Sequence, residues 1–137
     1  MRDIKRIVLH CSATVEGKEY SVDTIRSWHT AKGWSDIGYH YLISLDGCIG
    51  IGRPIDKQGA HVRGHNKDTI GICYVGGVDV DLKPKDTMTP EQEDTFRSLV
   101  ASIRTLFGED ITIHGHNEFS SKACPSFIVK EKFSDLY

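Results

Sequence analysis

The sequence predicts a single-domain α/β fold in which helices flank a mixed β-sheet. The chain has 137 residues, enough to bury one hydrophobic core and too few for two comfortable ones. Apolar runs of strand length alternate with segments of helical periodicity, and Asp46-Gly47 between two such runs is typical of a β-hairpin. A hairpin among otherwise separate strands makes the sheet mixed, and we expect one domain over residues 1–137.

The first predicted elements are a strand and a helix. Ile4 to Cys11 is rich in Ile, Val and Leu, which predicts a buried strand. Ser21 is placed to cap a helix from Val22 to about Lys32, because apolar residues recur there at helical spacing. Gly33 then follows at the position where helices commonly end.

The middle of the chain contains a hairpin, a loop and a second buried strand. Tyr39 to Leu45 and Cys48 to Arg53 are the predicted arms of the hairpin. Residues 59–68 are polar and contain glycine, so we expect a loop there. Thr69 to Val75 is predicted to be another central strand, closed by Gly76-Gly77.

The last third holds the longest predicted helix. Residues 78–88 are charged and contain a proline, which favours an exposed loop. Thr89-Pro90-Glu91-Gln92 then combines an N-cap, a proline at the first helical position and a capping-box glutamine. We expect this helix to end at Gly108, followed by a short strand over Ile111 to His114 and a C-terminal helix over Phe127 to Phe133.

Composition and charge exclude several classes of function. A net charge of −2 gives no reason to expect a nucleic-acid partner, and no apolar run approaches the roughly 20 residues of a membrane span. Residues 1–6 lack the apolar stretch and small-residue cleavage site of a signal peptide. We therefore expect a cytoplasmic protein as synthesised, and a monomer.

The four cysteines do not have the spacing of a disulfide framework. Cys11, Cys48 and Cys73 each lie in apolar surroundings, where a free cysteine behaves as a small buried hydrophobe. Without an export signal, reduced thiols are expected.

His10, His116 and Cys124 are candidate metal ligands. His10 ends the first apolar run, and the other two lie in one short C-terminal segment. Two imidazoles and one thiolate suit zinc, and three protein ligands leave the fourth tetrahedral position for water, which is typical of a catalytic site. Alternation along the strand sends Cys11 to the opposite face, so we do not expect it to bind the same metal.

His114 competes with His116 for the same role. The two residues are two apart in an extended segment, so both side chains are expected on the same side. The residues alone do not choose between them.

Lys122 and Tyr39 are the candidate catalytic groups. Lys122 is either a solvated surface lysine or the cation that stabilises negative charge on a carbonyl oxygen under attack. Tyr39 is either a core aromatic or, if it faces the metal, a group that holds or deprotonates the attacking water.

Four motifs, in the right order, resemble the type 2 N-acetylmuramoyl-L-alanine amidases. That family includes phage lysozyme-amidases and shares its fold with the peptidoglycan recognition proteins. The similarity covers residues 4–127, nearly the whole chain, and is strongest to the short, single-domain phage enzymes. The motifs are Leu9–Thr14, Trp34–Tyr41, Ile70–Gly77 and Lys122–Phe127.

The resemblance implies a mixed sheet with helices on its faces, a Zn²⁺ cleft on one side, and a role for each candidate residue. It makes His10, His116 and Cys124 the ligands, which selects His116 over His114, and it gives Tyr39 and Lys122 the catalytic roles. His61 corresponds to a cleft-wall position that touches substrate, although a loop histidine without a role is the alternative. Further residues that match positions on the substrate-binding cleft are Trp34, His40 and Asn66. Family members often have a proline before the motif lysine, where this chain has Ser121, which loosens the loop but removes no functional group.

The implied activity is zinc-dependent hydrolysis of the amide between the lactyl group of N-acetylmuramic acid and L-alanine of the peptidoglycan stem peptide. The implied partner is therefore peptidoglycan, and the implied process is endolysin-like cell-wall degradation. The alternative is a non-catalytic peptidoglycan-binding module of the same fold. Some peptidoglycan recognition proteins lose a zinc ligand, often through serine in place of cysteine, but this chain keeps Cys124.

Overall fold

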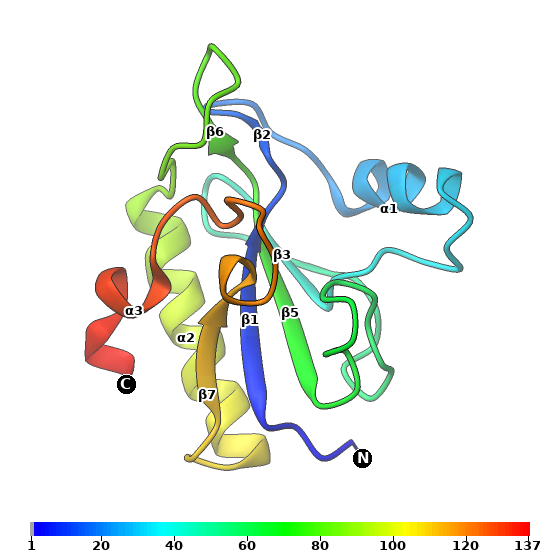
Figure 1. Cartoon of the computed structure of the whole chain (residues 1–137), viewed down its shortest axis with the longest axis vertical. Helices are drawn as coiled ribbons and strands as arrows, with labels where there is room; N and C mark the ends of the chain where they lie inside the picture. The colour runs from blue at the N-terminus through cyan, green and yellow to red at the C-terminus, as the bar shows by residue number, and fades with distance from the viewer. Residues whose placement is uncertain (1) are drawn as a thin grey trace.

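A computed structural model describes residues 2–137 and contains a five-stranded sheet in the order β4-β3-β5-β1-β7 (Figure 1). Its strands confirm the predicted mixed sheet, because β3, β5, β1 and β7 are parallel to one another and β4 is antiparallel to β3. The bounds of these strands are β1 Arg6–Cys11, β3 Tyr41–Ile43, β4 Ile49–Ile51, β5 Thr69–Tyr74 and β7 Thr112–Gly115.

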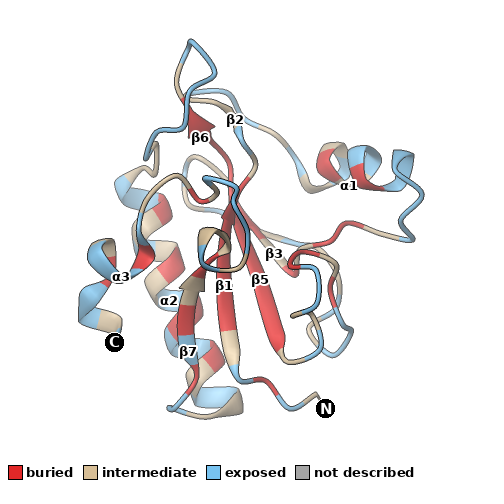
Figure 2. Ribbon diagram, in the orientation of Figure 1, coloured by how far each residue is buried: buried red, intermediate tan, exposed pale blue. Residues whose placement is uncertain are grey.

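The two central strands, β1 and β5, form the buried centre of the molecule (Figure 2). Every residue of β5 is buried, as is every residue of β1 after Arg6. Both sequences are mostly apolar, as expected for parallel strands that are covered on both faces.

Helix α2 (Pro90–Phe107) covers one face of the sheet, and its predicted start is confirmed. The Thr89 hydroxyl accepts a hydrogen bond from the Gln92 backbone N–H at 3.1 Å, and the Gln92 carboxamide oxygen accepts from the Thr89 N–H at 2.9 Å. The apolar face of α2 packs on alternate residues of β1. The principal core residues here are Ile7, Leu9, Phe96, Leu99, Val100 and Ile103.

Helix α1 (Val22–Ala31) covers part of the opposite face, and the predicted cap at Ser21 is confirmed. Ile25 packs with Leu42, Cys73 and Val75 in a second, smaller core cluster. Because side chains alternate along a strand, His10 lies on this face of β1, opposite to Leu9 and Cys11.

The structure differs from the sequence predictions in several local features. The C-terminal helix α3 spans only Val129–Lys132, because Ser126 adopts a positive φ of 76° and the Asn117 carboxamide donates to the Phe127 carbonyl at 3.0 Å. A two-stranded parallel sheet formed by β2 (Thr14–Val15) and β6 (Gly77–Val78) was not predicted.

The predicted burial of Cys48 was wrong, since this residue is exposed. It follows the hairpin turn, where its backbone N–H donates to the Asp46 carboxylate at 3.1 Å. Across residues 2–137, no helix combines the length and apolarity needed to cross a bilayer.

Candidate metal centre and its cleft

Parallel pairing of β1 and β7 brings His10 and His116 together. Leu9 is paired with Gly115, so the residues that follow them emerge at the same edge of the sheet. His116 begins a short 3-10 helix, η1 (His116–Glu118), directly after β7. The centroids of the His10 and His116 rings are 4.7 Å apart.

Cys124 reaches the two histidines from the loop between η1 and α3. Its Sγ lies 3.9 Å from His10 Nδ1 and accepts a hydrogen bond from the Cys11 backbone N–H at 3.1 Å. The Asn117 carboxamide, which donates to the carbonyls of Ala123 and Phe127, ties this loop to η1. The sulfur is therefore held by the end of β1 and by its own loop.

The geometry of these three side chains fits a zinc ion. One ligand atom from each of His10, His116 and Cys124 lies within 4.8 Å of the others. In a tetrahedral site with Zn–N near 2.0–2.1 Å and Zn–S near 2.3 Å, the nitrogen and sulfur are about 3.6 Å apart. The observed 3.9 Å between His10 Nδ1 and Cys124 Sγ is close to that value.

The two free imidazoles are in the charge state that metal binding requires, whereas the thiol is not. Burial lowers the pKa of His10 well below 6.5 and lowers the pKa of His116, so both rings are neutral and have a lone pair to donate. Contact with the Cys11 thiol, together with burial, raises the pKa of the Cys124 thiol. A bound cation would therefore supply the charge that stabilises the Cys124 thiolate.

His114 and the Cys11 thiol lie outside this cluster. Both ring nitrogens of His114 have other partners, the Glu118 carboxylate at 2.9 Å and the Thr112 hydroxyl at 2.7 Å. The Cys11 Sγ lies 3.8 Å from the Ser126 hydroxyl.

Tyr39 and Lys122 both lie near the histidines of the cluster. The Tyr39 ring is 5.1 Å from the His10 ring, and burial raises the pKa of its hydroxyl well above 10, with Cys73 and Cys124 adding to the effect. Lys122 is exposed, and its ammonium charge contributes to the lowered pKa of both His10 and His116. The Tyr39 hydroxyl therefore stays protonated at neutral pH, and the Lys122 charge is close enough to both histidines to affect their pKa.

A cleft of about 490 Å³ opens beside His116 and Lys122. Trp34, His61 and Asn66, three of the candidate substrate-binding residues, line it. The Asn66 carboxamide oxygen accepts the backbone N–H groups of His61 and Val62, each at 2.9 Å, so this side chain shapes the cleft wall.

His40 is placed differently from these three residues. It is 0% exposed and does not line the cleft. Its Nδ1 accepts the Gly71 N–H at 3.0 Å, and its Nε2 is 2.7 Å from the Lys57 carbonyl oxygen.

Arg63 and Phe119 also line the cleft and were not identified from the sequence. The available signal for Phe119 was an aromatic residue in a polar segment, three positions after a candidate ligand. Arg63 lies in the predicted loop over residues 59–68, where nothing in the sequence distinguishes it from other solvated arginines.

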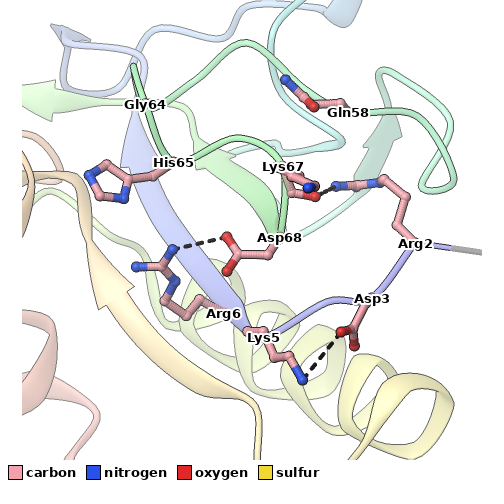
Figure 3. Close-up of a pocket in the computed structure, with 9 residues that line it drawn as sticks. All are labelled: Arg2, Asp3, Lys5, Arg6, Gln58, Gly64, His65, Lys67 and Asp68. Atoms are coloured by element: carbon pink, nitrogen blue, oxygen red, sulfur yellow. Dashed lines mark hydrogen bonds and ion pairs between the residues drawn. The ribbon is translucent and has the colours of Figure 1, made fainter.

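A second hollow, of about 530 Å³, lies on the other side of the 64–68 loop (Figure 3). Arg2, Lys5, Arg6 and Lys67 line it, and the first three have local partners. Arg6 pairs with Asp68 at 2.9 Å and Lys5 with Asp3 at 3.3 Å, as the dashed lines show. The hollow contains none of the candidate site residues.

Comparison with known proteins gives consistent matches over most of the chain. A family model described as N-acetylmuramoyl-L-alanine amidase matches residues 1–127. The endolysin of Klebsiella phage KP32 is 38% identical over 129 residues, which cover 94% of this chain and 85% of that protein. The endolysin of Escherichia phage T7 is 40% identical over 124 residues, covering 90% of this chain and 82% of that protein.

A solved structure agrees with these sequence matches. The N-acetylmuramoyl-L-alanine amidase LysC from Clostridium intestinale URNW superposes with a TM-score of 0.80 and 27% identity, covering 97% of this chain and 87% of that one.

Proposed function

The chain belongs to the N-acetylmuramoyl-L-alanine amidase family, and from this premise we propose that it is a zinc-dependent hydrolase of peptidoglycan. The bond cut joins the lactyl group of N-acetylmuramic acid to L-alanine of the stem peptide. The observation that carries the proposal is the cluster of His10, His116 and Cys124, whose ligand atoms lie within 4.8 Å of one another beside an open cleft. A nitrogen, nitrogen and sulfur set with one open position is typical of catalytic zinc.

Zinc bound by His10, His116 and Cys124 would supply a Lewis acid and a water molecule whose pKa is lowered to about 7. Lys122 lines the cleft next to His116, so its ammonium group stabilises negative charge on the carbonyl oxygen of the substrate. The raised pKa of Tyr39 makes its hydroxyl a hydrogen-bond donor at neutral pH rather than a base. We therefore assign Tyr39 to orienting the nucleophile and the leaving amine.

The shape of the cleft supports an extended, polar substrate. It is open and lined by the aromatic rings of Trp34 and Phe119 as well as by polar groups. Trp34 is 37% exposed and lines the cleft, which suits contact with a sugar or a peptide plane. We propose that Trp34 contacts the muropeptide, that Asn66 and His40 shape the cleft from behind, and that residues 1–137 act as one catalytic domain on the cell wall.

The proposal is tested by digesting purified peptidoglycan with the protein, with and without a chelator, and identifying the products by mass spectrometry. We expect release of stem peptides with new L-alanine amino termini, loss of this release in chelator, and recovery on addition of Zn²⁺. Binding to peptidoglycan without new amino termini would instead identify a non-catalytic binding module.

Replacement of the sulfur ligand gives the matching mutational test. Cys124→Ala should abolish detectable amidase activity and lower the zinc content after dialysis, because two imidazoles alone hold zinc weakly. Cys48→Ser is the control. Cys48 is exposed at the hairpin turn, so this variant should retain both amidase activity and zinc content. Full activity and normal zinc content in Cys124→Ala would remove Cys124 from the ligand set.

A further inference from the structure

The His61 side chain lies directly behind the candidate metal ligand His10. His61 Nδ1 is 2.8 Å from His10 Nε2, and His61 is only 8% exposed. Its ring packs flat against the backbone of Gly71 in β5, where a Cβ would lie 2.6 Å from His61 Cγ. Residue 71 must therefore be glycine for the ring to occupy this position.

A chain of hydrogen bonds continues from His61 to a fixed backbone acceptor. His61 Nε2 is 3.1 Å from the Thr69 hydroxyl, which donates to the His65 carbonyl oxygen at 2.7 Å. A carbonyl oxygen only accepts, so the Thr69 proton points toward His65 and its lone pairs face His61. His61 Nε2 must then carry the ring proton.

The same logic fixes the proton on His10. A neutral imidazole with its proton on Nε2 has an acceptor at Nδ1, so His61 Nδ1 accepts from His10 Nε2–H. The remaining lone pair of His10 is then on Nδ1, the atom that lies 3.9 Å from Cys124 Sγ. The His10 nitrogen that faces the thiol is thus the one free to bind a metal.

Arg2 and Arg6, which Figure 3 shows beside residues 64–68, hold the segment that carries the His65 carbonyl. The Arg2 guanidinium donates to the carbonyls of Asn66, Lys67 and Thr69 at 3.0–3.4 Å. Arg6 binds the Asp68 carboxylate at 2.9 Å. These contacts immobilise the segment that carries the His65 carbonyl and the Thr69 hydroxyl.

We propose that His61, backed by Thr69, is a positioning residue for the metal ligand His10. It accepts the Nε2 proton of His10, which selects the tautomer and ring orientation needed for Nδ1 to bind zinc. The inference rests on the proposed function, because it assumes a metal at His10, His116 and Cys124. It gives His61 a role behind the ligand, where both of its ring nitrogens are already engaged, rather than a polar contact with substrate.

Metal affinity in the absence of substrate tests this role. The assay is competition for Zn²⁺ with a chromophoric chelator, together with the visible absorption of bound Co²⁺, which reports ligand geometry. His61→Leu removes the acceptor, and we expect zinc affinity to fall about 10- to 100-fold, as for other outer-sphere partners of metal ligands. His61→Asn keeps an acceptor oxygen near the Nδ1 position and should recover most of that loss.

Thr69, the next group in the chain of hydrogen bonds, provides a second pair of variants. Thr69→Val removes the hydroxyl with little change of shape and should weaken zinc binding in the same direction as His61→Leu, whereas Thr69→Ser should retain wild-type affinity. Circular dichroism of each metal-free variant checks that the fold is kept.

The outcomes separate the inference from the proposed function. Tight zinc binding by the wild type with unchanged affinity and Co²⁺ spectrum in His61→Leu and Thr69→Val would overturn the positioning role and leave the amidase proposal intact. A raised KM with unchanged metal affinity in His61→Leu would likewise overturn it, in favour of a substrate contact. Failure of the wild type to bind zinc would overturn both.

Discussion

His114 and His116 show how two residues of one type acquire different roles within three positions. In an extended strand both side chains would lie on the same side, which is why the residues alone left the choice open. The strand ends at Gly115, and the 3-10 turn that starts at His116 directs this ring toward His10. His114 remains on the strand and binds Thr112 and Glu118.

The other residue-scale feature hidden from the sequence is the contact between His61 and His10. It depends on the conformation of the 59–68 loop, whose sequence has no periodicity that fixes a side-chain direction. The ligand types themselves were predictable, because imidazoles and a thiol at element ends are chemically specific. Their supporting hydrogen bonds were not, because they join positions 51 residues apart.

Replacement of Tyr39 by phenylalanine tests the assigned role of the hydroxyl. Tyr39→Phe keeps the ring 5.1 Å from His10 but removes a donor that the raised pKa keeps protonated. We expect kcat to fall about 10²- to 10³-fold, the usual effect of losing one oriented donor, with zinc content unchanged. Steady-state kinetics on a soluble muropeptide and metal analysis measure the two quantities. Wild-type kcat would remove Tyr39 from the mechanism, and Tyr41→Phe, two residues along the chain, is the control.

At the scale of elements, the strands and helices that build the site were predicted where a physical signal extended over several residues. The apolar runs of β1 and β5 and the capping box of α2 are such signals, and all three are confirmed. The β2–β6 pair was missed because each strand has two residues, too few for any period. It forms where β1 and β5 continue side by side beyond their ends, as the Thr14 N–H to Gly76 carbonyl bond shows.

Gln92 links α2 to the sheet and offers a prediction about this element. Its buried carboxamide nitrogen donates to the carbonyls of Ile43 and Val75, and its oxygen completes the helix cap. Gln92→Ala leaves two buried carbonyls without this donor, and we expect a loss of about 2–4 kcal/mol in the free energy of unfolding. Urea denaturation measures the loss. Asp94→Ala, an exposed position on the same helix, should change stability by less than about 0.5 kcal/mol, and an equally small change in Gln92→Ala would contradict this account.

At the scale of the whole molecule, the cleft side of the sheet is built around buried imidazoles. His10, His40 and His61 are each less than 10% exposed, and the sheet supplies backbone or histidine partners for them. Histidines buried in the neutral form bind protons only when the protein unfolds, so the stability of the entire fold is linked to pH.

His40 contributes a pH dependence of folding stability that is separate from the metal ligands. Burial lowers the pKa of His40 from 6.5 to about 4, so between these values the unfolded chain binds more protons than the folded one. Stability is therefore full above pH 6.5 and falls as the pH decreases toward 4. From pH 7.5 to 5.0 this single group should cost about 2 kcal/mol of unfolding free energy.

The replacement His40→Gln isolates that contribution. A glutamine side chain can accept the Gly71 N–H and donate to the Lys57 carbonyl, as His40 does, but it does not titrate. Urea denaturation of both proteins in chelator, at pH 7.5 and 5.0, should show that the variant loses about 2 kcal/mol less than the wild type over this interval. Chelator removes the separate pH dependence of metal binding, and His10 and His61 are present in both proteins. Equal losses in the two proteins would mean that His40 is protonated in the folded state, and the buried bond from the Gly71 N–H to Nδ1 would then have to break at acid pH.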